Sequence, residues 1–393
     1  MKARSTRQEF EVEAAMSKNY QTGNCRRKLA TFGCLFLALI ASTIALADGP
    51  ALDHKAQQAA PIKLGSTGQN SLDPCLAGTL GSLVTDDKEN VYILSNNHVM
   101  ARLNAGAVGE TIQHSAKLDT FGCLNLTSFQ VGSLSAFAPL VFGGVSTVDA
   151  AIARTDATKT DAKGTILDVG VVNPQTKLPQ LLLLVRKAGR TTGDTHGLVV
   201  SINSQVNVRY SNGLVTTFNN QIMMIGLTPV AFFSQPGDSG SLVVTDTGNR
   251  GLTPNRPVGL LFAGGVRRFS IRGIPLGTYA VTFANPINAV LQDPAFAGLN
   301  LHFVGQTARP DAADAPADPN IQAAAQVKNQ YADYLMGLPE VVGHGIGLSQ
   351  VTSGVVAIQV YLRQATPEAL QALPSSLGGI PVVAVEIGDI EAY

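Results

Sequence analysis

The sequence predicts a mainly β protein, in which two six-stranded antiparallel β-barrels are followed by a small α/β domain. Three observations lead to this prediction. The 393 residues include 39 glycines and 20 prolines, and only 14% are charged, which favours strands and tight turns over helical bundles. Short runs of Val, Ile, Leu and Thr alternate with turn residues, as in barrels and sandwiches. After residue 320 the pattern changes to alternating helices and strands.

Residues 1–47 have the order of a secretory signal peptide. Arg26-Arg27-Lys28 precedes the apolar stretch 29–46, which ends in Ala45-Leu46-Ala47. We expect cleavage after Ala47 and a secreted or periplasmic protein without stable membrane association. The alternative is an uncleaved membrane anchor, because the apolar stretch is close to the minimum length for crossing a bilayer.

Residues 48–305 are expected to hold both barrels. The first opens with a hairpin over residues 78–94 that turns at residues 86–90, and continues with strands at 131–136 and 147–153. A polar stretch at residues 154–164 separates it from the second. The second barrel is expected to contain strands at 181–186, 197–202, 206–210, 221–225, 240–245 and 258–262, and a closing helix at 285–292.

Residues 306–320, dense in Ala, Asp and Pro, predict an exposed linker. The domain at residues 321–393 is expected to have helices at 321–336 and 367–373 and strands at 341–348, 355–362 and 380–387. One hypothesis for this domain is an autoinhibitory or folding-assisting segment. The other is a module for stability or for docking a partner.

The number and spacing of the cysteines indicate whether the protein holds a disulfide or a metal site. Without residues 1–47 only Cys75 and Cys123 are left, and two cysteines in an exported protein favour one disulfide; two free buried thiols are the alternative. No CxxC or clustered His/Cys spacing occurs, so we predict no metal site and no cofactor.

Net charge is zero and no basic run is interleaved with aromatics, so we predict no nucleic-acid partner. Nothing in the sequence indicates the oligomeric state.

The hexapeptide Pro236-Gly237-Asp238-Ser239-Gly240-Ser241 precedes an apolar strand. A serine is a poor nucleophile unless it is positioned and deprotonated, and flanking glycines permit a sharp turn with N–H groups aimed at an oxyanion. An ordinary Gly/Ser turn is the alternative. Upstream, His98 ends one apolar strand and Asp149 begins another, which favours catalysis. Asp119 also lies between His98 and Ser239, in a more loop-like setting.

The order His98, Asp149, Ser239 resembles the chymotrypsin-like serine peptidases over about residues 75–292. A closer resemblance, which includes residues 187–193 and 258–264, is to bacterial trypsin-like peptidases related to the plant narrow-leaf protein. The resemblance implies a serine endopeptidase acting on proteins or peptides. Ser239 is then the nucleophile, His98 the base and Asp149 its orienting acid, with the N–H groups of Gly237 and Ser239 as the oxyanion hole. The alternative is a catalytically silent fold that binds peptides.

The resemblance also implies a substrate pocket formed by Phe233 and by Leu261, Phe262, Ala263 and Gly264. Phe233 argues against a buried carboxylate that selects Arg or Lys and indicates a shallow apolar pocket. Arg267, Arg268 and Arg272 could instead favour acidic substrates, although such charges are more often solvated. A neutral histidine base predicts activity that falls as pH drops through roughly 6–7.

One departure from the resemblance concerns Asp238. In zymogen-derived peptidases a newly cut amino terminus, from an Ile/Val-Val-Gly-Gly segment, pairs with the acid before the serine. This sequence lacks that segment, so Asp238 must find another partner or leave its loop mobile until substrate binds.

Overall fold

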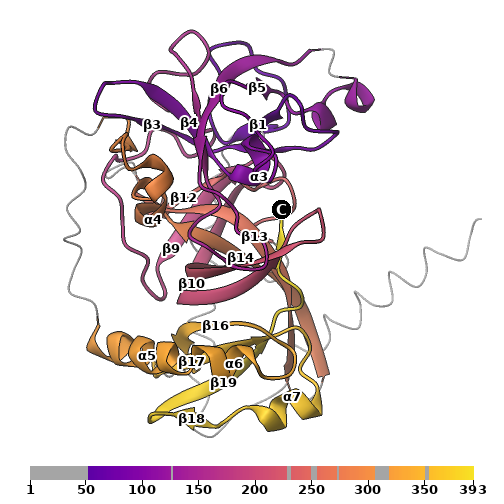
Figure 1. Cartoon of the computed structure of the whole chain (residues 1–393), viewed down its shortest axis with the longest axis vertical. Coiled ribbons are helices and arrows are strands. Elements are labelled where there is room, and N and C mark those ends of the chain that lie inside the picture. The colour runs from indigo at the N-terminus through magenta and orange to yellow at the C-terminus, as the bar shows by residue number, and fades with distance from the viewer. Residues whose placement is uncertain are drawn as a thin grey trace, which may run out of the picture. The chain divides into compact units, whose positions relative to one another are not determined.

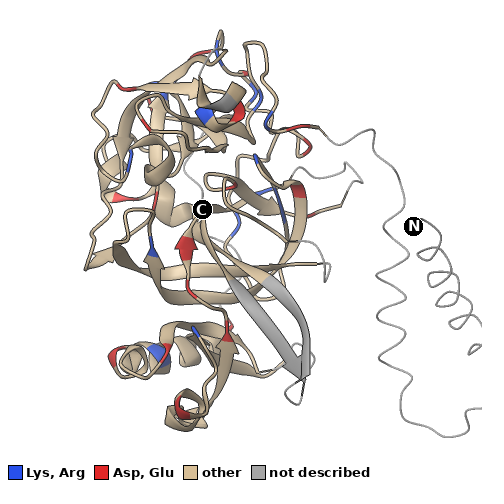
Figure 2. Ribbon diagram, turned by 90° about the vertical axis from the view of Figure 1, so that its right-hand side faces the viewer, with Lys and Arg blue, Asp and Glu red and all other residues tan. Residues whose placement is uncertain are grey.

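The computed structural model describes residues 52–124, 127–227, 232–248, 255–271, 274–305, 318–349 and 354–393. The expected signal peptide and nearly all of the expected linker lie outside these residues. Among the described residues, no helix combines the length and the apolar character needed to span a bilayer. Acidic and basic residues are interspersed along the described ribbon (Figure 2).

The first sheet forms a barrel around six central strands. In spatial order these are β3 (Ser82–Thr85), β4 (Val91–Ser95), β8 (Ala151–Arg154), β6 (Phe129–Phe137), β5 (Thr111–His114) and β1 (Ser66–Asn70), with β15 (His302–Phe303) and β2 (Gly78–Leu80) added at the two ends. Only Gly81 separates β2 from β3, and β2 pairs with β1. The sheet therefore curls back on itself.

The second sheet closes in the same way. Its six central strands are β10 (Gly193–Arg209), β9 (Leu184–Gly189), β12 (Leu242–Thr245), β13 (Pro257–Ile271), β14 (Ile274–Pro286) and β11 (Val215–Gly226), and β7 (Val145–Ser146) lies beyond β11. Direct pairing of β10 with β11 closes the ring. The short helix α4 (Ile287–Leu291) follows β14, and the 3₁₀ turn η4 (Pro294–Phe296) leads to β15.

The α/β module after residue 317 extends the second sheet. Its strands are β16 (Val341–Leu348), β17 (Val356–Leu362), β19 (Ile380–Glu386) and β18 (Ser376–Leu377), and its helices are α5 (Pro319–Gln330), α6 (Ala332–Met336) and α7 (Pro367–Ala372). Because β16 pairs antiparallel with β10, the sheet continues from the barrel into the module. The chain then leaves β19 and returns to β13 as β20 (Glu391–Ala392), with its end near α3 (Asn97–Met100) (Figure 1).

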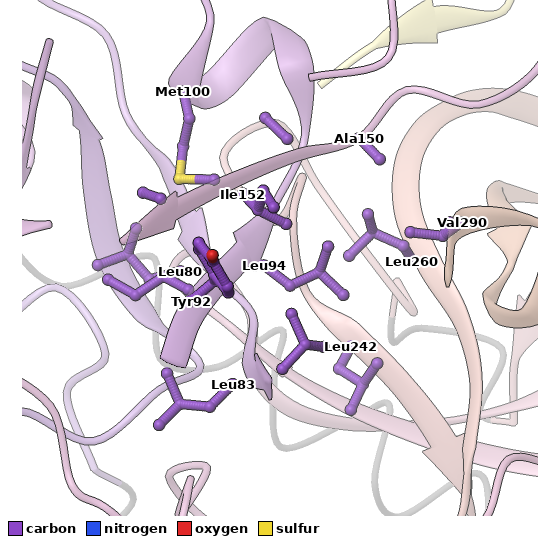
Figure 3. Packing of buried hydrophobic residues seen from close by; sticks show 14 of the residues in the cluster. Leu80, Leu83, Tyr92, Leu94, Met100, Ala150, Ile152, Leu242, Leu260 and Val290 are labelled. Carbon is purple, nitrogen blue, oxygen red and sulfur yellow. The ribbon is translucent and has the colours of Figure 1, made fainter. Parts of the chain in front are cut away.

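The largest hydrophobic cluster draws on both sheets. Leu80, Leu94 and Ile152 of the first sheet pack in one cluster with Leu242 and Leu260 of the second (Figure 3). All five side chains are almost fully buried. Since burial of a large aliphatic side chain contributes about 1.5–3 kcal/mol, this shared core holds the two barrels in a defined arrangement.

The structure confirms the mainly β fold with two closed sheets, in each of which the six central strands pair antiparallel. It differs from the sequence prediction in several elements. The strand β1 was not predicted because its residues, Ser-Thr-Gly-Gln-Asn, show no apolar alternation although all are buried. The strands expected at 197–202 and 206–210 are the single strand β10, whose register shifts between Val199 and Val206 absorb the irregular pattern. The helix expected at 321–336 is divided into α5 and α6 at Tyr331.

Candidate active site

His98 and Asp149 meet because their strands are neighbours. Ser95 at the end of β4 pairs with Ala151 at the start of β8, so the residues just after β4 and just before β8 leave the same end of the sheet. His98 lies in α3 (Asn97–Met100), and its Nδ1 is 2.5 Å from Oδ2 of the fully buried Asp149. The His98 main-chain N–H donates to Oδ1 of the same carboxylate at 3.3 Å.

Three further side chains hold Asp149 in place. The Tyr210 hydroxyl donates to Oδ2 at 2.8 Å, the Asn96 amide donates to the Asp149 carbonyl at 2.7 Å, and the Asn285 carbonyl oxygen accepts from the Asp149 N–H at 2.9 Å. Burial, reinforced by the Asp149 charge, raises the pKa of Tyr210 well above its usual value, so this hydroxyl stays a donor. The carboxylate thus accepts from His98 and Tyr210 while its main chain is tied on both sides.

The environment of His98 favours its protonated form. Burial opposes the charge on the imidazole, but the charge and hydrogen bond of Asp149 outweigh it and raise the pKa of His98 above its ordinary value. A base that gains basicity from a buried carboxylate is suited to accept a proton from a hydroxyl group.

Ser239 lies in the turn that precedes β12. Its Oγ donates to the Phe262 carbonyl at 3.1 Å. Gly237 and Gly240 have φ values of +99° and +93°, a region that favours glycine. Within the described residues, the N–H groups of Gly237 and Ser239 meet no hydrogen-bond acceptor, which leaves both free to bind an oxyanion.

Strand β2 of the first sheet holds this turn. The Thr79 hydroxyl donates to the Gly237 carbonyl at 2.9 Å, and the Thr79 N–H donates to the Ser239 carbonyl at 2.8 Å. A residue of the first barrel therefore sets the backbone of the serine turn in the second.

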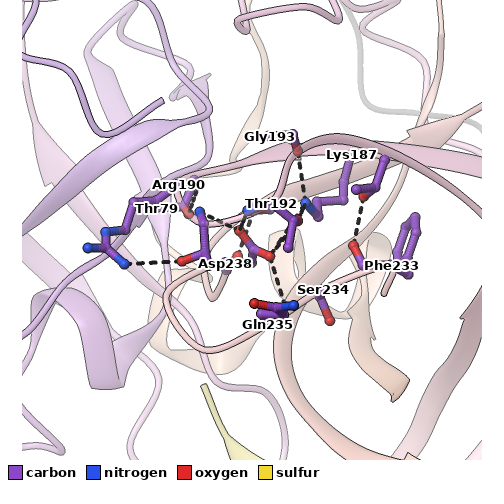
Figure 4. Close-up of polar contacts among 12 residues, drawn as sticks. Thr79, Lys187, Arg190, Thr192, Gly193, Phe233, Ser234, Gln235 and Asp238 are labelled. Carbon is purple, nitrogen blue, oxygen red and sulfur yellow. Dashed lines mark hydrogen bonds and ion pairs between the residues drawn. The ribbon is translucent and has the colours of Figure 1, made fainter. Parts of the chain in front are cut away.

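Asp238 has the partner that the sequence left open. Its Oδ1 accepts from the N–H groups of Thr191 and Thr192, at 2.8 and 3.1 Å, and its Oδ2 accepts from the Gln235 N–H at 2.9 Å (Figure 4). The ammonium of Lys187, fully buried on β9, lies 3.5 Å from Oδ2. Burial lowers the pKa of Lys187 although the Asp238 charge opposes this. An internal lysine thus occupies the place that a cut amino terminus holds in zymogen-derived peptidases.

Asp119, the other acid between His98 and Ser239, is engaged elsewhere. It lies in the 3₁₀ turn η2 (Lys117–Asp119), where its carboxylate accepts from the Arg190 guanidinium and from the Thr67 hydroxyl. Both members of the Arg190–Asp119 pair are largely buried. The structure therefore brings Asp149, and not Asp119, to His98.

The expected pocket residues divide into two groups. Phe233 and Leu261 are fully buried in one cluster. Phe262 turns its ring the other way, onto Phe218, with ring centroids 4.8 Å apart, so only its main-chain oxygen reaches Ser239. Arg272 and the side chains of Arg267 and Arg268 lie outside what the structure describes.

The last residue of the sequence also lies in the site. The main-chain oxygen of Tyr393 is 2.9 Å from Nε2 of His98, and the Tyr393 N–H donates to the Phe262 carbonyl at 3.2 Å. Sequence reasoning did not identify Tyr393, Tyr210 or Lys187 as site residues. Tyr393 and Tyr210 are far in the chain from His98 and Asp149, and Lys187 is far from Asp238.

The predicted disulfide is present. Cys75, in the loop between β1 and β2, is bonded to Cys123 in the 3₁₀ turn η3 (Phe121–Cys123), with a Cα–Cα distance of 5.6 Å. Among the described residues, no group of three or more His, Cys, Asp or Glu side chains is arranged to hold a metal ion.

No protein-family model matches the sequence, and no curated protein matches it. Among solved structures it is similar to Thermobifida fusca protease A and Cellulomonas bogoriensis chymotrypsin, each at 18% identity and a TM-score of 0.37 over 62% of this chain and 99% of theirs. A serine protease specific for glutamic acid shares 16% identity, with a TM-score of 0.39 over 62% of this chain and 100% of that one. These neighbours are proteases, and the proposal below rests on the geometry of this chain.

Proposed function

We propose that the protein is a serine endopeptidase in which Ser239 is the nucleophile and His98 is the general base. Asp149 orients the imidazole of His98 and raises its pKa. The contact between the buried Asp149 carboxylate and Nδ1 of His98 carries this proposal. With Nδ1 bound to Asp149, the other ring nitrogen, Nε2, contacts the main-chain oxygen of Tyr393. The Tyr393 N–H in turn donates to the Phe262 carbonyl, which also accepts from the Ser239 hydroxyl. A base oriented by an acid, with a serine on a neighbouring turn, is the arrangement that activates a hydroxyl.

In the reaction, Ser239 Oγ attacks the carbonyl carbon of the scissile bond and its proton passes to Nε2 of His98. The N–H groups of Gly237 and Ser239 bind the resulting oxyanion, a contribution of about 3–4 kcal/mol per donor in such sites. The protonated His98 then gives its proton to the leaving amine as the C–N bond breaks. Water repeats these steps on the acyl-enzyme and releases the carboxylic acid and free Ser239.

The serine must rotate before it reacts. Its hydroxyl donates to the Phe262 carbonyl, and a turn about χ1 redirects it toward His98. Departure of Tyr393 from Nε2 leaves that nitrogen free to accept the proton.

We also propose that the protein works outside the cytoplasm. The apolar stretch before Ala47 and the Cys75–Cys123 disulfide support export to an oxidising compartment. The narrower placement beside peptidases related to the narrow-leaf protein stays a proposal that rests on residues 187–193 and 258–264.

A fluorophosphonate probe tests the activity, because it reacts only with an activated serine. We expect residues 48–393, and the same chain without residues 391–393, to be labelled at Ser239. The Ser239→Ala variant should keep its fold by circular dichroism, lose labelling and lose casein hydrolysis by a factor on the order of 10⁵–10⁶.

Ser135→Ala, on β6 of the first sheet, is the matched control and should be labelled as strongly as the parent. If neither chain length is labelled while both are folded, the peptide-binding alternative is correct and the proposed activity is wrong.

A further inference from the structure

Residues Ile390–Tyr393, called the tail here, lie along β13 as an additional strand. Ala392 is opposite Ala263 and Glu391 is opposite Gly264 in antiparallel register. On the other edge of the tail, the Arg209 N–H of β10 donates to the Ile390 carbonyl at 2.9 Å. Main-chain pairing of this kind holds an extended peptide regardless of most of its side chains.

The tail ends where a scissile carbonyl must lie. The Tyr393 N–H and the Ser239 hydroxyl share one acceptor, the Phe262 carbonyl, at 3.2 and 3.1 Å. The Tyr393 oxygen is 2.9 Å from Nε2 of His98. The main chain of Tyr393 is therefore placed beside the base, and it shares a hydrogen-bond acceptor with the nucleophile, as expected of the acyl half of a bound peptide.

The Tyr393 side chain is partly buried against the second barrel, at the position that we call the pocket. The ring packs against the cluster that contains Phe233 and Leu261, and its hydroxyl is hydrogen-bonded to Ser234. A Cβ placed on Gly264 would collide with the ring, so glycine at this position opens the pocket to an aromatic side chain. Burial, with smaller contributions from nearby acids, raises the pKa of Tyr393, which keeps its hydroxyl neutral.

The pocket has no free charge to select a basic or acidic residue among the described side chains that line it. Two carboxylates act on the Tyr393 hydroxyl, Asp238 and Glu391. Asp238 is already bound by Lys187 and by main-chain N–H groups, and Glu391 belongs to the tail itself. Ser234 also bonds to Thr282 at 2.5 Å, so it stays satisfied when no tyrosine hydroxyl is present. The pocket therefore suits Tyr and accepts Phe.

The connection from β19 to the tail is packed and specific. Ile387 and Ile390 are buried in a cluster of the second barrel, and Asp389 pairs with Arg363 at 2.7 Å. A Cβ on Gly265 would lie 2.8 Å from the Ile387 carbonyl, so β13 leaves room for this connection. The α/β module thus presents the tail to the site.

We propose that the tail occupies the substrate cleft in the manner of a bound peptide, so that the site cleaves after Tyr and Phe and is inhibited by its own chain. This inference rests on the proposed peptidase activity, and it adds the substrate class and the regulation. A tail tethered to its site acts at an effective concentration in the millimolar range, so even a weakly binding peptide competes with substrate.

The Tyr393→Asp variant tests the inhibition, because a carboxylate in the apolar pocket is disfavoured and should expel the tail. We expect kcat/KM for a succinyl tetrapeptide 4-nitroanilide ending in Phe to rise about tenfold or more over the parent. Glu391→Gln, at an exposed position of the tail, is the matched control and should behave as the parent. The synthetic peptide Asp-Ile-Glu-Ala-Tyr should inhibit Tyr393→Asp competitively, and Asp-Ile-Glu-Ala-Asp should not.

The substrate class is measured on Tyr393→Asp with nitroanilides ending in Phe, Ala, Arg and Glu. We expect Phe to exceed Arg and Glu by about 100-fold or more, since a mismatched charge must be buried. Gly264→Val in the same background should lower kcat/KM for Phe and spare Ala, because it fills the pocket.

The outcomes separate the two proposals. If Tyr393→Asp is labelled by fluorophosphonate but cleaves no faster than the parent, or prefers Arg or Glu, the further inference is wrong and the peptidase stands. If folded Tyr393→Asp is not labelled, the peptidase activity is wrong and this inference fails with it.

Discussion

His98 shows how a single residue acquires its chemistry from its surroundings. Burial alone would keep the imidazole neutral, but Asp149 lies against Nδ1 and reverses that effect. Tyr210 adds a donor to the same carboxylate, which stabilises the anion that His98 faces. The result is an imidazole with a raised pKa, whose other ring nitrogen, Nε2, contacts the main-chain oxygen of Tyr393.

This environment predicts the acid limb of the pH profile. Activity needs neutral His98, and its pKa is raised above 6.5, so kcat/KM should fall as pH drops through a midpoint above 6.5. An unperturbed histidine predicts this fall in activity at roughly pH 6–7, and the raised pKa of His98 moves it to the upper part of that range or above it. In Asp149→Asn the rate of fluorophosphonate labelling should be lower and its midpoint should move to lower pH. An unchanged midpoint in that variant would contradict the role given to Asp149.

At the scale of elements, the hairpin between β9 and β10 holds the serine turn. Lys187 on β9 and the N–H groups of Thr191 and Thr192 converge on Asp238, while Thr79 on β2 binds Gly237 and Ser239 from the other side. The N–H groups that we propose as oxyanion donors are thus positioned by contacts within the chain.

Removing the lysine should therefore affect both stability and activity. Lys187→Met leaves the Asp238 charge buried without its cation, which should cost about 3–5 kcal/mol in the free energy of unfolding. We expect labelling of Ser239 to slow as well. Lys159→Met is the matched control, because its pair with Asp156 is exposed and worth about 0–1 kcal/mol. Equal midpoints for the two variants in urea unfolding would count against this role.

For the whole molecule, the α/β module is part of the peptidase sheet. β16 pairs with β10, and the hydroxyl of the fully buried Tyr361 on β17 bonds to Ser201 and Ser204 on β10. These contacts support the hypothesis that the domain contributes to stability, and the contacts of the tail support the inhibition that we propose.

Comparing a chain that lacks the whole α/β module with one that lacks only the tail should distinguish the stabilising contacts of the module from the effect of the tail. Residues 52–305 alone would expose the edge of β10, and an unpaired edge strand promotes aggregation. We expect a low soluble yield and a lower unfolding temperature than for the chain that lacks only residues 391–393. Leu370→Ala, an exposed position on α7, should leave yield unchanged. A truncated chain as soluble and stable as the parent would show that the module serves only to present the tail.

Features that are encoded locally could be predicted from the sequence: alternating strands and turns, the pairing of Cys75 with Cys123, and the serine turn with a histidine and an acid in order. It did not reveal β1, whose buried residues are polar. The tertiary structure decided which acid meets His98, that Lys187 holds Asp238, and that Tyr393 fills the pocket beside Ser239. Sheet closure and strand pairing bring these groups together, and a buried charge or ring finds its partner only after distant segments have packed.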